Sequence, residues 1–152
     1  MDTDIRQTIG DREIVIECVF HAARNLVWAA WSEPERLAHW WGPDGFSTSF
    51  EAFEFREGGD WRFVMHGPDN MEFPNHNIFV EIGEPERLVI DHVEPPGFKI
   101  TATFEAHGSQ TRLTFRQTFE SSDIFESVKP YAVPGGRQTI EKLARYIQTM
   151  RG

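Results

Sequence analysis

Histidine is the residue type in this 152-residue chain best suited to acid–base or metal chemistry, and six are present. His76 and His92 stand out because both project onto the inward face of neighbouring predicted strands, where an imidazole could act as a general base near neutral pH. No third metal ligand is evident, since Glu94 lies at a loop edge and His66 has the opposite strand parity. No HExxH or paired CxxC motif occurs, so we expect no metal ion and no cofactor.

Nucleophilic and nucleotide chemistry has little support in the sequence. Cys18 is the only cysteine, and it falls on the apolar face of a predicted strand, as expected for a small core residue. No GxSxG motif marks an activated serine. The glycine pair at 58–59 fits a tight hairpin with positive φ, the pair at 135–136 fits the start of a helix, and neither has the pattern of a phosphate loop. We therefore assign no catalytic residue.

Composition limits the class of partner. The formal charge of −9 argues against nucleic acid, which requires a basic surface, and against anionic membranes. A single cysteine excludes an intrachain disulfide, and a reducing compartment suits it. The segment MDTDIRQTIGD, residues 1–11, is polar, and no apolar run reaches the length that spans a membrane. We expect a cytoplasmic protein.

The elements that must position the histidines follow from apolar periodicity. Residues 14–20 alternate as a strand. The tryptophan-rich segment 24–41 has helical spacing interrupted at residues 33–34, which predicts two short helices. A short helix is expected around residues 123–128, followed by a breaker run that ends Pro134-Gly135-Gly136. An apolar stripe at 140–150 then predicts a long terminal helix.

Between these helical segments the chain consists of short strands separated by turn residues. We place the turns at 57–60, 67–74, 83–86, 94–97 and 107–110. This order predicts an α+β domain, with helices packed on one face of an antiparallel sheet. We assign residues 1–11 to a short polar tail and residues 12–152 to a single domain.

Symmetric pairing about each turn predicts which residues share the inward face. One row then contains Trp61, Val80, Ile90, Ala102 and Phe115, and the next contains Phe63, Ile78, His92, Ile100 and Gln117. Phe79 and Val89 fall on the opposite, solvent face. The inward face is apolar at one end and gains His76, His92 and Gln117 at the other. These polar groups either hydrogen-bond one another or the backbone, or they orient a ligand in a cavity.

The combined motifs resemble the bacterial SRPBCC domains of the START/Bet v-like superfamily that are related to the C-terminal domain of the heat-shock protein 90 ATPase activator. They are VWAAWSEPERLAHWWGPDGF (27–46), EGGDWRFVM (57–65), FPNHNIFVEIGEPERLV (73–89), TATFEAHGSQTRLTFRQTF (101–119) and GGRQTIEKLARYI (135–147). The resemblance implies a helix-grip fold, in which a curved antiparallel sheet holds a long C-terminal helix over a hydrophobic cavity. Members of the superfamily bind lipids, sterols, polyketides or plant hormones, and a few are cyclases or hydrolases.

We therefore expect a protein that binds a small apolar or amphipathic molecule. The expected lining consists of inward-facing strand residues and the stripe of the terminal helix: Trp61, Phe63, Met65, His76, Ile78, Ile90, His92, Ile100, Phe115, Gln117, Leu143 and Ile147. Among them, His76, His92 and Gln117 would orient the polar end of the ligand.

Two alternatives stay open. The first is a cyclase- or hydrolase-like enzyme that uses His76 or His92 as general base. The second is a co-chaperone or stress-related interaction module, which predicts an exposed apolar patch around Trp40-Trp41 and Phe46. The eukaryotic activator needs a further N-terminal domain for that role, and this chain is too short to contain one. A twofold homodimer is compatible with the sequence.

The tryptophan-rich segment has two interpretations. Its rings either fill the junction between the two short helices and the sheet, or Trp28, Trp31 or Trp40 reaches the cavity mouth and stacks on a ligand.

Overall fold

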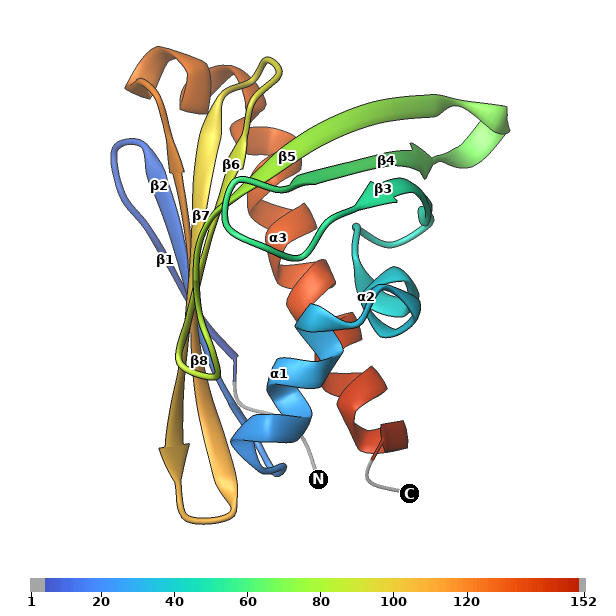
Figure 1. The fold of residues 1–152 in the computed structure, drawn as a ribbon. Helices are drawn as coiled ribbons and strands as arrows, with labels where there is room; N and C mark the ends of the chain where they lie inside the picture. The colour runs from blue at the N-terminus through green and yellow to red at the C-terminus, as the bar shows by residue number, and fades with distance from the viewer. Residues whose placement is uncertain (1–4, 151–152) are drawn as a thin grey trace.

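The computed structural model describes residues 5–150 of the protein. An eight-stranded antiparallel sheet curves around a long C-terminal helix, α3, which spans Ser122–Met150 (Figure 1). The strands lie in the order β1-β2-β8-β7-β6-β5-β4-β3. Their bounds are β1 Ile5–Ile9, β2 Glu13–Phe20, β3 Ser47–Phe53, β4 Asp60–His66, β5 Glu72–Gly83, β6 Arg87–His92, β7 Phe98–His107 and β8 Gln110–Phe119. The predicted α+β helix-grip fold is confirmed.

The N-terminal segment differs from the prediction. Within the expected polar tail, Ile5–Ile9 forms β1, which pairs with β2 from Ile5 opposite Cys18 to Ile9 opposite Ile14. An edge strand has one unpaired side and needs few apolar residues, so its polar sequence gave little strand signal. The two short helices consequently follow the second strand rather than the first. Residues 1–4 lie outside the described residues.

Two short helices connect β2 to β3, as the tryptophan spacing predicts. They are α1, Arg24–Ser32, and α2, Pro34–Trp40, and they meet at Glu33, whose backbone is extended. Proline suits the first position of α2, because a backbone N–H at that position would have no partner within the helix. All four tryptophans of this segment are buried, and Trp40 Nε1 donates a hydrogen bond to Ala30 O at 3.0 Å. The rings therefore fill the junction between helices and sheet.

The C-terminal helix is longer than predicted. The expected breaker run around Pro134-Gly135-Gly136 lies inside α3, which is continuous and contains Pro130 and Pro134. Proline removes one backbone hydrogen bond and bends a helix without ending it when packing holds both sides. Figure 1 shows the first turns crossing the top of the sheet before the helix turns down along it. The predicted apolar stripe is confirmed, with Ile140, Leu143, Ala144 and Ile147 buried.

The strand register is partly as predicted. Across β7 and β8, Ile100 pairs with Gln117 and Ala102 with Phe115, as symmetric pairing requires. Across β6 and β7, His92 pairs with Phe98 rather than Ile100. That shift is by an even number of residues, so every side chain keeps its predicted face.

The β4–β5 pairing was wrong and changes the inward face. Trp61 pairs with Asn77, not Val80, because β5 already begins at Glu72, inside the segment expected to be a turn. A β-bulge at Val80 separates two parts of β5: Ile82 pairs with Leu88 as predicted, but before the bulge Phe79 pairs with Ile90, so that part of the strand turns its other face inward. Phe79 is consequently buried in the core instead of facing solvent, and Val80 is exposed.

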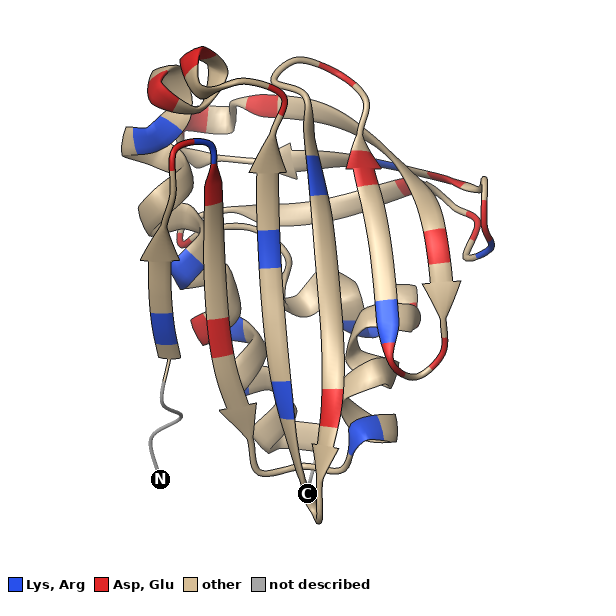
Figure 2. Ribbon diagram, turned by 90° about the vertical axis from the view of Figure 1, so that its left-hand side faces the viewer, with Lys and Arg blue, Asp and Glu red and all other residues tan. Residues whose placement is uncertain are grey.

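Charges of both signs are spread over the outer face of the sheet (Figure 2). Cross-strand pairs include Arg116 with Glu13 at 2.8 Å and Lys99 with Asp91 at 3.4 Å. Such exposed pairs contribute about 0–1 kcal/mol each. Within residues 5–150, no helix combines the length and apolar character needed to cross a bilayer.

Candidate functional site

A pocket of about 300 Å³ lies between one end of the sheet and the first half of α3. Strands β4 to β8 form one wall, α3 forms another, and the segment between α2 and β3 closes the side. Its lining is Trp41, Gly42, Pro43, Phe63, Met65, Asn75, Asn77, His92, Pro96, Phe98, Ile100, Phe115, Gln117, Phe119, Val128, Tyr131, Ala132, Gly135, Gly136 and Thr139. The volume lies at the lower end of the roughly 300–1,000 Å³ found for small-molecule sites.

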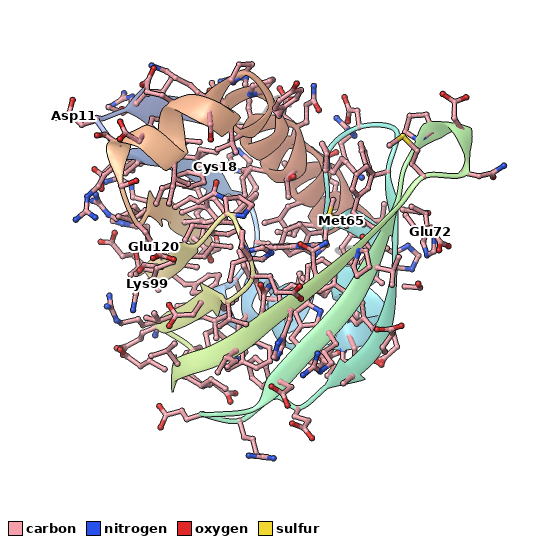
Figure 3. The ribbon with its side chains drawn as sticks, turned by 90° about the horizontal axis from the view of Figure 1, so that it is seen from above. Asp11, Cys18, Met65, Glu72, Lys99 and Glu120 are labelled. Carbon is pink, nitrogen blue, oxygen red and sulfur yellow. The ribbon has the colours of Figure 1, made fainter. Side chains whose placement is uncertain are left out.

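The structure brings half of the predicted lining residues to this pocket. They are Phe63, Met65, His92, Ile100, Phe115 and Gln117. Four others, Trp61, Ile90, Leu143 and Ile147, are buried in the core and do not line it. Figure 3 looks down on this end of the sheet, where Met65 lies on the α3 side of the β4–β5 hairpin and Glu72 on the opposite side.

His76 and Ile78 lie on the outer face, so their predicted place in the cavity was wrong. Their positions follow from the β4–β5 register, which pairs Arg62 with His76 and Asp60 with Ile78. His76 Nε2 lies 2.8 Å from Asp60 Oδ1. That hydrogen bond lowers the pKa of the Asp60 carboxyl. The pair therefore joins β4 to β5 on the outside of the sheet.

The same register error concealed two polar lining residues. Asn75 and Asn77 occupy the inward positions of β5 that we assigned to His76 and Ile78. The sequence itself indicated that this register was wrong, because it left the large apolar side chain of Phe79 on the solvent face. Reversing the parity of β5 up to Phe79 buries that ring and brings both asparagines inward, while Ile82, beyond the bulge, keeps its predicted face. On α3, Tyr131, Ala132 and the two glycines were missed as lining because that segment was expected to break the helix.

His92 is held at the junction of β6 and the pocket by three contacts. Its Nδ1 donates to Pro96 O at 2.9 Å, its Nε2 lies 2.8 Å from Asn75 Oδ1, and its ring stacks on Phe98 with 4.4 Å between centroids. Burial lowers the pKa of His92, and the Pro96 carbonyl and the Glu94 charge oppose that effect. Both ring nitrogens face a protein oxygen rather than open space, although a neutral ring carries one N–H and donates to only one of these two acceptors at a time.

Two side chains of α3 hold the wall between α2 and β3. Lys142 Nζ donates to Gly42 O at 3.2 Å and to Pro43 O at 3.5 Å, while Gln138 Oε1 accepts from Asp44 N at 3.1 Å. Burial lowers the pKa of Lys142, partly offset by Asp44. Gly42 has a φ of 111°, which favours glycine at this turn. The wall of the pocket is thus attached to the same helix that lines it.

Comparison with known proteins identifies the family. A sequence model of the family described as Activator of Hsp90 ATPase homolog 1-like protein (AHSA1) matches residues 21–148. The chain belongs to this family. Comparison with curated proteins found no match.

Solved structures share the AHSA1-like fold over almost the whole chain. A solution structure of a protein from Arthrobacter aurescens is 27% identical, with a TM-score of 0.87, and covers 96% of this chain and 91% of its own. A crystal structure of a protein from Nitrosomonas europaea is 23% identical, with a TM-score of 0.84, over 94% and 99% of the two chains. The AHSA1 protein from Silicibacter pomeroyi is 17% identical, with a TM-score of 0.73, over 91% and 99%.

Three polar side chains of this AHSA1-like protein, Ser49, His66 and Glu72, lie close together on the outer face of the sheet. Ser49 Oγ is 2.7 Å from His66 Nε2, and His66 Nδ1 is 3.3 Å from Glu72 Oε2. A serine, a histidine and a carboxylate connected in this order have the arrangement of a nucleophile with its general base and the group that orients the base. However, none of the three residues lines the pocket, and Ser49 and Glu72 are exposed. We therefore interpret the group as a surface hydrogen-bond chain.

Within residues 5–150, no three histidine, cysteine or carboxylate side chains are grouped so that they could hold a metal ion.

The stability of the protein should depend on pH through His92. Its pKa in the folded state is lowered below the ordinary 6.5, so the unfolded chain takes up this proton more readily. Stability is therefore lost as the pH falls below about 6.5. We expect the thermal midpoint to fall between pH 7.5 and pH 5, and to fall less in His92→Gln.

His107→Gln provides the matched control, because His107 is exposed at the end of β7. This variant should keep the wild-type pH dependence. Equal slopes of midpoint against pH in the wild type and His92→Gln would contradict the prediction.

Proposed function

We propose that this AHSA1-like protein binds a small, largely apolar molecule in the pocket between the sheet and α3. The observation that carries the proposal is the composition of the lining. Phe63, Phe98, Ile100, Phe115 and Phe119 supply apolar surface from three strands, β4, β7 and β8. Polar side chains gather in the same space from β5, β6 and β8. An apolar cavity with a few polar groups is the usual form of a small-molecule site.

The two alternatives have less support. An enzyme with His92 as general base would first have to break one of the two contacts made by the ring nitrogens. An interaction module needs an exposed apolar patch at Trp40-Trp41, yet both rings are buried. Binding without catalysis therefore fits the site best. We place the protein in the cytoplasm, in keeping with its single cysteine.

A neutral fluorescent probe tests the proposal. N-phenyl-1-naphthylamine should bind saturably at one site, and Ala132→Trp should weaken it at least about tenfold, because the indole would occupy the pocket from α3. Fluorescence titration measures both affinities. Ala132 lines the pocket and is half-buried, so a larger ring at that position is directed into the same space.

Arg145→Trp is the matched control, since Arg145 is exposed on the same helix and does not line the pocket. It should bind the probe like the wild type. Thermal unfolding establishes that both variants are folded. Wild-type affinity in Ala132→Trp, or an equal loss in Arg145→Trp, would reject the pocket as the binding site. Native mass spectrometry of the purified protein would identify any retained molecule and would also test the expected homodimer.

A further inference from the structure

Asn77 is a buried polar residue of the pocket with an unsatisfied side-chain hydrogen-bond acceptor. It lies on β5, is 1% exposed and lines the pocket. Its Oδ1 has no hydrogen-bond partner among residues 5–150. A buried acceptor left in this state costs about 1–3 kcal/mol. A native protein that keeps such a group within a pocket wall has a reason to do so.

The neighbouring asparagine shows that the strand itself does not impose this state. Asn75 lines the same pocket two residues earlier, and both ends of its amide face a polar atom of the protein. Its Nδ2 donates to Phe73 O at 2.8 Å, and its Oδ1 lies 2.8 Å from His92 Nε2. Asn77 pairs directly with His92 across β5 and β6, yet His92 is occupied by Asn75 and Pro96. Asn77 Oδ1 is therefore a buried acceptor of a pocket-lining residue, and a donor on a ligand would satisfy it once this side chain turns toward the pocket.

The charge of the lining restricts the ligand further. Of residues 5–150, no aspartate, glutamate, lysine or arginine lines the pocket, and the titratable side chains that do are His92 and Tyr131. Tyr131 is 77% exposed and so lies at the mouth. An ionised group placed deep in this space would lose its hydration without gaining a counter-charge, which is strongly unfavourable. The buried part of the ligand must be neutral.

We propose that the pocket selects neutral molecules whose buried end carries a hydrogen-bond donor, a hydroxyl or an N–H group, that binds Asn77 Oδ1. This inference rests on the proposed function and specifies the ligand class of the same site. Gln117 lies three strands away on β8, about 14 Å for strand spacings of about 4.8 Å. With its donor bound to Asn77, the ligand would place its apolar body against Ile100 and Phe115, in the direction of Gln117.

Trp61 offers an internal alternative that the test must address. It pairs with Asn77 across β4 and β5, and its indole N–H is also buried without a partner. Trp61 does not line the pocket, so a ligand does not reach it directly. If a side-chain rotation paired Trp61 with Asn77, the pocket would not discriminate between donor and non-donor ligands.

A matched series of naphthalenes tests the inference by displacement of N-phenyl-1-naphthylamine. The series consists of 2-naphthol with a donor, 2-methylnaphthalene of similar shape without one, 2-acetylnaphthalene with an acceptor only, and 2-naphthoate with a charge. We expect 2-naphthol to bind about tenfold more tightly than 2-methylnaphthalene, the effect of one added hydrogen bond to a buried acceptor. Naphthoate should bind more weakly than either.

Asn77→Leu should abolish this preference, bringing 2-naphthol and 2-methylnaphthalene to within about twofold. Leucine has a similar shape and removes the unpaired oxygen, so the thermal midpoint of the variant should equal or exceed that of the wild type. A large drop in midpoint would show that Asn77 has a structural partner and would overturn the inference. The wild-type series decides the question even if the variant fails to fold.

The outcomes separate the two proposals. If no member of the series and no probe binds, the proposed function fails. If 2-naphthol and 2-methylnaphthalene bind the wild type equally, binding stands and the donor requirement is wrong. Tightest binding by 2-acetylnaphthalene would also overturn the inference, since the buried group would then be acting as a donor.

Discussion

Trp31→Ala should lower the free energy of unfolding by about 3–5 kcal/mol, the range for deleting a buried aromatic side chain. Trp31 is 1% exposed and lies at the centre of the aromatic cluster. Its ring centroid is 4.8 Å from Trp40, 5.9 Å from Trp41, 5.8 Å from Phe104 and 6.2 Å from Phe115. Removing it leaves a cavity among large rings on three elements, which cannot close by small movements. Urea unfolding followed by circular dichroism measures the loss.

The same variant should also weaken probe binding, because Trp41 and Phe115 pack against Trp31 and line the pocket. Phenylalanine variants separate volume from hydrogen bonding. Trp40→Phe deletes an N–H that donates to Ala30 O, whereas Trp31→Phe deletes one without a partner. Trp40→Phe should therefore be the costlier change by about 1 kcal/mol. A loss below about 1.5 kcal/mol in Trp31→Ala would contradict a central packing role.

Elements with strong apolar periodicity could be predicted from the sequence. The stripe Ile140, Leu143 and Ile147 defined the lower part of α3, and the alternation from Ile14 to Phe20 defined β2. Burial of one face produces both patterns directly. Pro130 and Pro134 obscured the upper part of α3, because a local rule against proline in helices was outweighed by tertiary packing of the surrounding turns.

Register was predictable only where the turn was short. The β7–β8 hairpin turns at residues 108–109, with Gly108 at a φ of 63°, and symmetric pairing about it was correct. The β4–β5 connection was expected to be an eight-residue turn at 67–74, but Asp69 and Asn70 both adopt positive φ and tighten it. Asparagine and aspartate tolerate positive φ, but their presence in a sequence indicates that conformation less clearly than glycine does. Asn75 and Asn77 were missed because of the β5 register, and Tyr131, Ala132, Gly135 and Gly136 because α3 was not expected to be continuous.

Gly59→Ala should destabilise the protein by about 3 kcal/mol, near the upper end for an added methyl group in a packed site. Gly59 is buried at the start of β4, and a Cβ there would overlap the backbone oxygen of Glu54 and lie 2.9 Å from that of Arg56. Neither oxygen can rotate away, since both belong to the backbone of the hairpin that joins β3 to β4. Chemical denaturation measures the loss.

Gly58→Ala is the matched control one residue away. Gly58 is exposed with open space around its Cβ position, but its φ is 83°, so alanine should cost only about 1 kcal/mol of backbone strain. Positive φ was the reason we gave for both glycines, yet only Gly58 has it. At Gly59 the requirement is close approach: its carbonyl accepts from Phe79 N at 3.0 Å, while Gly58 N donates to Phe79 O at 2.7 Å.

These contacts connect the turn to the pocket, because they fix the β3–β4 hairpin on β5. The hairpin carries Phe63 and Met65, and β5 carries Asn75 and Asn77. Displacing the turn in Gly59→Ala should therefore also reduce affinity for N-phenyl-1-naphthylamine, whereas Gly58→Ala should retain it. Equal destabilisation by the two substitutions would show that the hairpin tolerates a side chain at Gly59. The pocket wall would then not depend on this close approach.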